Sequence, residues 1–421
     1  MTTLQKDKQY IWHPLTQHQT ASAPIAIASA KGAVLYGEDG KEYIDGIASW
    51  YTSMYGHCHP YIIEQVTKQM QVLDQVVFTG FTHKPATTLA QKVLAILPEN
   101  QKKIFFNDNG STAVEAGIKM ALQYHFNKGE KRDTLIAFQD GFHGDTFGAM
   151  SVSGLSVYNG PFKDHFLNVV RIPTPTSENL DEVLALLENL IAAYSCAGFV
   201  YEPLVQGAAG MKMYPAEGLE AILRICKLHD VVTIADEVMT GFGKTGKHFA
   251  SLHVETFPDI MCLSKALTAG LAPMSLTTCA QHIFDGFLDE KITSGFFHAH
   301  TYSANPLACA AAIAGIDLML SDEMKANNLR IQEKHTAFAK AIKDHSKVIN
   351  LRQAGIILAF ELETEMERYG SERARLYDFF MQEGVCLRPL GNTIYIHPPL
   401  VTTDEQLDKI YASILKVLNL F

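Results

Sequence analysis

The sequence predicts an α/β fold, with a large domain built on a mixed, mostly parallel sheet and a smaller α+β domain. Short β-branched runs alternate with helical segments from about residue 100 to 265, which is typical of parallel strands joined by crossover helices. The chain has 421 residues, more than a single hydrophobic core usually serves. From residue 349 onward, short strands and helices follow in an α+β order. We therefore expect two domains.

The domain boundaries follow from the same pattern. We place one near residue 320, where an alanine-rich helix gives way to a long polar one. The hairpin expected at residues 32–46 has a Glu-Asp-Gly turn, and the tail alone offers only a small sheet. We expect residues 1–60 to join the small domain, residues 61–320 to form the large domain, and residues 321–421 to form the rest of the small domain.

Composition limits the classes of partner. The net charge is −10, which argues against binding to nucleic acid. The first residues contain no apolar segment that would suit a signal peptide, and the longest apolar run, near residues 308–320, is too short to cross a membrane. The seven cysteines are scattered, odd in number and without metal-ligand spacing. We expect a cytoplasmic protein with free thiols and no metal or membrane partner.

The remaining elements are expected in chain order. Helices are expected at residues 60–73, 84–95, 110–126, 180–194, 218–228, 307–320, 323–345, 371–383 and 404–418. Strands are expected at residues 103–107, 134–138, 198–203, 231–236, 258–265, 274–280, 355–362, 385–388 and 393–396.

Two of these strands end near ionisable residues. Asp236 ends one, and Lys265 ends the next one 29 positions later. Reactive groups gather at the carboxyl ends of parallel strands. A lysine for a Schiff base and a carboxylate against a pyridinium nitrogen are what pyridoxal 5′-phosphate requires, so the pair predicts that cofactor.

Two further features fit the same cofactor, although each has a simpler interpretation. Gly110 and Ser111 open a helix after a strand, where backbone N–H groups and a hydroxyl can bind a phosphate. A plain helix cap explains that pattern equally well. Phe142 follows another strand and could stack on a flat ring, although a lone phenylalanine is more often part of the core.

Two other motifs are interpreted as accidental. Residues 241–246 match G-x-G-x-x-G, but no amphipathic helix follows, and His248 stands where a P-loop needs serine or threonine. His57, Cys58 and His59 are too close together for a usual zinc site.

Taken together, the motifs resemble those of the class III aminotransferases over nearly the whole chain. They are residues 109–115, 142–146, 235–238, 264–266 and 305–308. Within the class, residues 12–14, 45–50 and 388–391 are similar to the branch that aminates 8-amino-7-oxononanoate in biotin synthesis, usually with S-adenosyl-L-methionine as donor. Asp145 stands where most of the class has arginine, and is typical of that branch.

The resemblance implies a fold type I pyridoxal phosphate enzyme that forms a homodimer with shared active sites. It implies that Lys265 is the catalytic residue that bonds to the cofactor, and that Asp236 pairs with its ring nitrogen. Gly110 and Ser111 of one subunit and Thr301 of the other would hold the phosphate, and Phe142 would cover the ring.

For the small-molecule substrates, we expect a binding site lined by Trp50, Tyr51, Asp145, Arg388 and Tyr395. Arg388 is the natural partner of the keto acceptor's carboxylate, because a guanidinium pairs with a carboxylate through two hydrogen bonds.

The sequence leaves alternatives for the amino donor and for the exact reaction. Differences from the usual pattern of the branch fall at Leu15, Tyr51, Phe142, Lys244 and His300. They leave lysine as an alternative donor to S-adenosyl-L-methionine. Another ω-aminotransferase acting on ornithine, 4-aminobutyrate or a diamine is the nearest alternative, and a racemase or mutase of the same fold is a more distant one.

Overall fold

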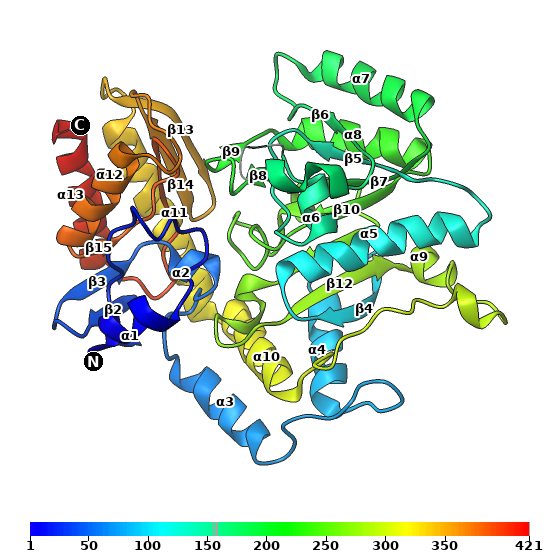
Figure 1. The fold of residues 1–421 in the computed structure, drawn as a ribbon, viewed down its shortest axis with the longest axis horizontal. Helices are drawn as coiled ribbons and strands as arrows, with labels where there is room; N and C mark the ends of the chain where they lie inside the picture. Colours follow the sequence, from blue (N-terminus) through cyan, green and yellow to red (C-terminus); the bar gives the residue numbers. More distant parts are fainter. Residues whose placement is uncertain (155, 157–158, 421) are drawn as a thin grey trace.

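A seven-stranded sheet forms the centre of the larger half of the molecule (Figure 1). The computed structural model describes residues 1–154, 156 and 159–420. The strand order is β4 (Gln101–Asn107), β12 (Ser275–Ala280), β11 (Ile260–Leu263), β10 (Val232–Asp236), β7 (Cys196–Tyr201), β5 (Thr134–Phe138) and β6 (Val169–Ile172). Only β12 runs antiparallel to its neighbours β11 and β4. The predicted mixed, mostly parallel sheet is confirmed.

Helices cover this sheet and explain its apolar strands. Every residue of β5, β7, β10, β11 and β12 is buried, as expected for strands covered on both faces. The helix α5 (Gly110–Asn127) packs on β7, β11 and β12. The helix α8 (Ala216–Leu228) packs on β10 and on α7 (Leu180–Ala193). The helix α10 (Pro306–Leu320) packs against α3 (Pro60–Met70) and α4 (Lys84–Leu94).

The smaller half combines the two ends of the chain (Figure 1). Its first sheet has the order β1 (Ile27–Lys31), β2 (Val34–Gly37), β3 (Glu42–Asp45) and β15 (Val385–Cys386), and the β3–β15 pair is parallel. Its second sheet joins β13 (Val348–Ala354), β14 (Ile357–Leu362) and β16 (Thr393–Ile396). Three helices belong to the same region of the chain: α11 (Asp322–Ile342), α12 (Ser371–Gln382) and α13 (Asp404–Leu420). The domain boundaries at residues 60 and 320 stay predictions.

The structure adds elements that the sequence pattern did not reveal. The strand expected at 355–362 is the second arm of the hairpin β13–β14, which turns at Gly355 with a φ of +55°. A Cβ atom at Gly355 would lie 2.3 Å from the carbonyl oxygen of Lys244, so the turn requires glycine. The strand β6 was also not anticipated. None of the helices in the described part of the chain is long and apolar enough to cross a membrane.

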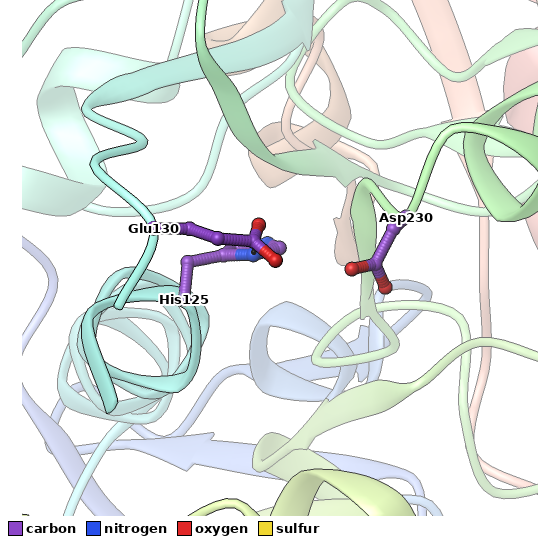
Figure 2. A group of neighbouring side chains, drawn as sticks. All are labelled: His125, Glu130 and Asp230. Atoms are coloured by element: carbon purple, nitrogen blue, oxygen red, sulfur yellow. Dashed lines mark hydrogen bonds and ion pairs between the residues drawn. The ribbon is translucent and has the colours of Figure 1, made fainter. Parts of the chain in front are cut away.

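One ionic cluster lies at the far end of α5, shown in Figure 2. The ligand atoms of His125, Glu130 and Asp230 lie within 4.8 Å of one another. Lys128 forms ion pairs with both carboxylates, and Arg132 pairs with the same two. Because two cations already neutralise these carboxylates, we interpret the cluster as an ion-pair network between α5 and the loop before β10.

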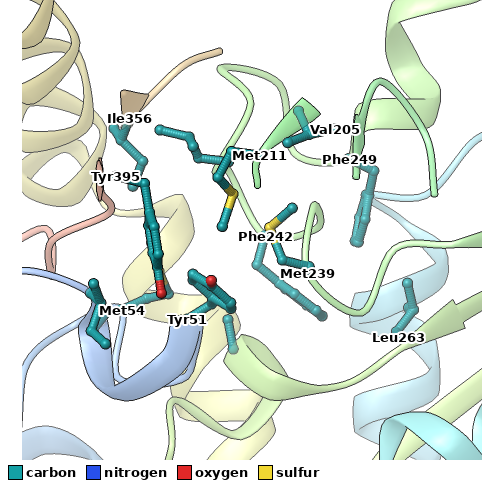
Figure 3. Packing of buried hydrophobic residues seen from close by; sticks show 14 of the residues in the cluster. Tyr51, Met54, Val205, Met211, Met239, Phe242, Phe249, Leu263, Ile356 and Tyr395 are labelled. Atoms are coloured by element: carbon teal, nitrogen blue, oxygen red, sulfur yellow. The ribbon is translucent and has the colours of Figure 1, made fainter. Parts of the chain in front are cut away.

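The hydrophobic core is continuous between the two halves (Figure 3). Tyr51 and Tyr395 come from the smaller half, and their rings lie 5.9 Å apart. They share a cluster with Met239, Phe242 and Leu263 of the larger half. This shared core lies next to the carboxyl ends of β10 and β11, so it supports the residues described below.

Candidate active site

Asp236 and Lys265 lie at the carboxyl ends of two adjacent parallel strands, but Lys265 opens a 3-10 helix, Lys265–Thr268, after β11 instead of ending that strand as the sequence pattern indicated. Asp236 is the last residue of β10 and stands opposite Cys262 of β11. Lys265 follows β11 and has a φ of +50°, a left-handed conformation that a lysine adopts only when the surrounding structure enforces it. Burial lowers the pKa of Lys265, while the nearby carboxylates of Asp236 and Glu202 oppose that shift. Burial thus moves the amine of Lys265 toward its uncharged, nucleophilic form.

The carboxylate of Asp236 is fixed in orientation by two donors. Nδ1 of His143 lies 2.8 Å from Oδ2, and the backbone N–H of Val238 donates to Oδ1 at 3.0 Å. Asp236 and His143 are both buried. Nε2 of His143 has no hydrogen-bond partner in the described structure. A buried, oriented carboxylate at a strand end is suited to bind a protonated ring nitrogen.

A second buried acid, Glu202, lies directly after β7. Its two carboxylate oxygens accept the backbone N–H groups of Phe142, at 3.0 Å, and Gly207, at 2.9 Å. Burial, together with the charge of Asp236, raises the pKa of Glu202 to about 7, against the effect of His143 and of the two N–H donors. Glu202 thus ties the loop that carries Phe142 to the end of the neighbouring strand.

The first turn of α5 forms a cradle suited to an anion. Asn109 caps the helix by accepting the N–H of Thr112 at 3.0 Å, and Gly110 is the first helical residue. The Ser111 hydroxyl accepts the N–H of Asp145 at 3.3 Å. A Cβ atom at Gly144 would lie 2.0 Å from Ser111 Oγ, so only glycine fits beside this hydroxyl. Exposed N–H groups at a helix N-terminus favour phosphate or carboxylate.

Trp50 and Tyr51 belong to an unusual left-handed turn. Residues 48–51 all have φ values between +46° and +72°. Such a conformation costs about 1–2 kcal/mol per residue, so tertiary contacts must maintain it. Asp45 supplies some of these contacts, because its buried carboxylate accepts from the Ser49 hydroxyl at 2.9 Å and from His57 Nε2 at 2.8 Å.

This turn brings aromatic rings against a guanidinium and an amine. The guanidinium of Arg388 lies 4.9 Å from the Trp50 ring centroid. The amine of Lys265 lies 4.9 Å from the centroid of the Tyr51 ring. The hydroxyl of Tyr395 has no partner in the described structure, and burial raises the pKa of Tyr395 to about 12. The turn therefore joins the predicted substrate residues to the lysine.

A cleft of about 1750 Å³ opens beside this group. Its lining includes Phe142, Asp145 and Arg388, and the Phe142 side chain is 44% exposed. Asp236 and Lys265 do not line it. An exposed phenylalanine at the end of a strand leaves one ring face free for a planar ligand.

Thr301 is the predicted site residue that lies apart. It is exposed, and its carbonyl oxygen accepts from Gln75 Nε2 at 2.9 Å. Among the described hydrogen bonds, none joins it to the other candidate residues.

Sequence reasoning missed three residues that organise the site: Asp45, His143 and Glu202. The signal for Glu202 was its position after a strand, which is the same signal that identified Asp236. His143 directly follows the predicted stacking residue. Its contact with Asp236 joins positions 93 residues apart, and no local pattern encodes that contact.

A buried acid holds the segments on either side of the loop at residues 241–246. The carboxylate of Glu237 accepts from Thr240 Oγ1 at 2.6 Å and from the N–H groups of Ala250, at 3.1 Å, and Ser251, at 2.6 Å. Only a short 3-10 segment, at Ala250–His253, follows this loop.

The fold and these groups define an α/β transferase of fold type I. The chain belongs to the class-III aminotransferases, because the model of that family matches residues 15–418. It is 40% identical over 419 residues to an adenosylmethionine-8-amino-7-oxononanoate aminotransferase of Synechococcus elongatus, covering 97% of this chain and 98% of the relative.

Solved structures agree with the family. A protein of the same description from Methanocaldococcus jannaschii superimposes with a TM-score of 0.91 at 32% identity, covering 98% of both chains. An amine transaminase from an uncultivated Pseudomonas species, in its PLP-bound form, superimposes with a TM-score of 0.88 at 27% identity, covering 96% of this chain and 97% of that chain.

Proposed function

We propose that the protein is a pyridoxal 5′-phosphate-dependent transaminase that moves an amino group from S-adenosyl-L-methionine to 8-amino-7-oxononanoate, giving 7,8-diaminononanoate for biotin synthesis. The observation that carries the proposal is the placement of Lys265 beside Asp236 at the carboxyl edge of β10 and β11. The names of the full-length relatives support the choice of acceptor and donor.

The residues present fit the cofactor. The cradle at Gly110 and Ser111 leaves no room for a side chain at Gly144, while it offers N–H donors to a phosphate. The exposed ring of Phe142 would cover the cofactor ring. Asp236, oriented by His143 and Val238, would pair with the ring nitrogen.

When bound, pyridoxal phosphate supplies a protonated ring that accepts the electron pair released as the substrate's C–H bond breaks. Asp236 would pair with the protonated ring nitrogen, because its carboxylate is buried and held in one orientation. Lys265 would hold the cofactor, and its side-chain amine is the group that would carry a proton to and from the reacting substrate carbon. The lowered pKa of Lys265 suits that task, because a general base must be unprotonated near neutral pH.

Substrate selection would fall to the residues around the cleft. Arg388 binds the acceptor's carboxylate, with its guanidinium held over Trp50. Asp145, which lines the same cleft, binds the acceptor's amino group through its negative charge. Tyr51 and Tyr395 form the wall between Lys265 and the smaller half.

We also propose that the active enzyme is a homodimer in the cytoplasm. The exposed position of Thr301 suits a role in the phosphate site of a second subunit. The scattered, unpaired cysteines suit a reducing compartment.

Two measurements test this proposal: an assay of acceptor conversion and the visible absorbance of the bound cofactor. We expect the purified enzyme to convert 8-amino-7-oxononanoate in the presence of S-adenosyl-L-methionine, with lysine, ornithine and 4-aminobutyrate as parallel donors. If lysine were the only donor that supported turnover, lysine would replace S-adenosyl-L-methionine as the proposed donor. If no donor supported conversion of the oxononanoate, the proposed function would be wrong.

Two variants separate the catalytic lysine from a general loss of structure. Lys265→Ala should lose both turnover and the visible absorbance of the bound cofactor, since the amine that bonds to it is gone. Lys247→Ala, at an exposed lysine in the nearby loop, should keep both.

A further inference from the structure

Besides Arg388, the cleft is lined by another arginine that forms no ion pair in the described part of the chain. Arg373 lies on α12 and lines the same cleft as Arg388. Its Nε donates to the carbonyl oxygen of Pro389 at 3.0 Å, which ties it to the residue directly after Arg388. Its guanidinium lies 5.3 Å from the centroid of the Tyr377 ring. Arg373 and Arg388 are thus each placed against an aromatic ring, on neighbouring segments of one wall.

Neither guanidinium forms an ion pair with any carboxylate in the described part of the chain. The cleft does contain acids, but several already have other partners. Asp39 pairs with Lys41, Asp140 pairs with Lys212, and Glu38 accepts from Thr3. Asp145 and Asp378 line the cleft without an ion pair to either arginine.

The two guanidinium groups repel each other. Burial and the nearby Arg388 charge hold the pKa of Arg373 below its ordinary value. Burial raises the pKa of Tyr377, and the charges of both arginines oppose that shift. A pair of half-buried cations without an ion-pair partner is unfavourable, so a negative ligand that joins them gains from both charges.

We propose that Arg373 and Arg388 together bind one carboxylate, the one remote from the reacting carbon of the keto acceptor. A carboxylate has two oxygens and about four acceptor positions, enough for two guanidinium groups. This inference rests on the proposed function, in which the acceptor's carboxylate and keto group stand at C1 and C7. Lys265 does not line the cleft wall that carries the two arginines. A carboxylate bound by these arginines would therefore lie away from the reacting carbon.

The donor's carboxylate does not suit this position. In an α-amino acid donor the carboxylate is bonded to the carbon that reacts, so it stays near Lys265. We therefore expect Arg373 to act on the acceptor half-reaction and to leave the donor half-reaction unchanged.

Binding of simple probes tests the pair without any turnover. Nonanoate carries the nine-carbon chain and the carboxylate, and nonanamide is its neutral counterpart. For the cofactor-loaded enzyme, we expect Arg373→Gln to weaken nonanoate binding by about tenfold or more, as for loss of a charged hydrogen bond, and to leave nonanamide binding unchanged. Glutamine keeps a donor for the Pro389 carbonyl oxygen, so the variant mainly removes the charge.

Arg368→Gln is the matched control. Arg368 lines the same cleft, but its Nη1 donates to the carbonyl oxygen of Ala208 at 2.8 Å. Its loss should change nonanoate binding less than twofold. Arg373→Lys, which keeps the charge without the planar fork, should give an intermediate loss.

The kinetics of the two half-reactions should separate in the same way. Arg373→Gln should raise the KM for 8-amino-7-oxononanoate while the rate of the donor half-reaction stays within twofold of the unchanged enzyme. The inference is overturned if Arg373→Gln binds nonanoate as tightly as the unchanged enzyme, or if nonanoate and nonanamide lose affinity equally. Failure to bind nonanoate at all would also overturn it. Absence of oxononanoate turnover would instead contradict the proposed function, and probe binding reports independently of that result.

Discussion

The imidazole of His143 holds the carboxylate of Asp236, with Nδ1 2.8 Å from Oδ2. The Val238 N–H holds the other oxygen of the same carboxylate. Because both partners of the His143 contact are buried, water cannot replace it easily when it is lost. His143 is therefore a positioning residue for the group that would pair with the cofactor ring.

Replacing His143 should weaken cofactor binding. A hydrogen bond to a charged group contributes about 1.5–3 kcal/mol, so we expect His143→Ala to raise the Kd for pyridoxal phosphate by about tenfold or more. His143→Asn keeps a donor near the Nδ1 position and should recover part of this loss. Absorbance titration of the apoprotein measures both, with the exposed His229→Ala as control. Equal affinity in the alanine variant and the unchanged protein would contradict the role.

Removing Asp45 should destabilise the left-handed turn at residues 48–51. Asp45→Ala leaves the Ser49 hydroxyl and His57 without their buried acceptor, so we expect the free energy of unfolding to fall by about 3 kcal/mol. Urea denaturation measures the loss. Asp39→Ala, in the exposed β2–β3 turn, should change stability by less than about 0.5 kcal/mol.

The fluorescence of Trp50 reports directly on the turn at residues 48–51. Trp12 is 89% exposed, so in a Trp12→Phe background Trp50 is the remaining tryptophan. If Asp45→Ala releases the turn, the Trp50 emission should change before global unfolding. An unchanged spectrum with unchanged stability would show that other contacts hold the turn.

Local sequence patterns predicted the sheet and the Asp236–Lys265 pair, because both depend on short β-branched runs and on the rule for strand ends. They could not predict the turn at residues 48–51. Four left-handed residues contradict local preference, and the contacts that offset the strain include the Tyr395 ring, far along the chain. The β3–β15 pair was similarly hidden, because β15 has only two residues and its partner lies near the other end of the chain.

Glu202 should make the apoprotein less stable as the pH rises. Its pKa is about 7 in the fold against 4.5 as the ordinary value, so the folded state binds more protons between these limits. The stabilisation present below pH 4.5 is lost progressively up to pH 7, by about 3 kcal/mol. Glu202→Gln should abolish this fall of the unfolding free energy between pH 4.5 and 7. The substitution also disturbs one of the two backbone N–H contacts. Urea denaturation of the apoprotein between pH 4.5 and 8 tests it, and identical slopes in the two proteins would refute the assignment.

Lys244 should have the opposite pH dependence. Its side chain is fully buried, its Nζ has no partner in the described structure, and burial together with the Lys265 charge lowers its pKa well below the ordinary value. The unfolded chain therefore binds more protons than the fold at every pH between that lowered pKa and about 10.4, and stability rises with pH over this window. Lys244→Met removes the buried amine and keeps an unbranched side chain, so we expect it to raise the free energy of unfolding at pH 7 by about 2 kcal/mol and to flatten the rise. Lys247→Met, at an exposed lysine, should leave both the free energy of unfolding and its pH dependence unchanged. If the Lys244→Met protein were instead less stable than the unchanged protein at pH 7, the Lys244 amine would have a stabilising partner.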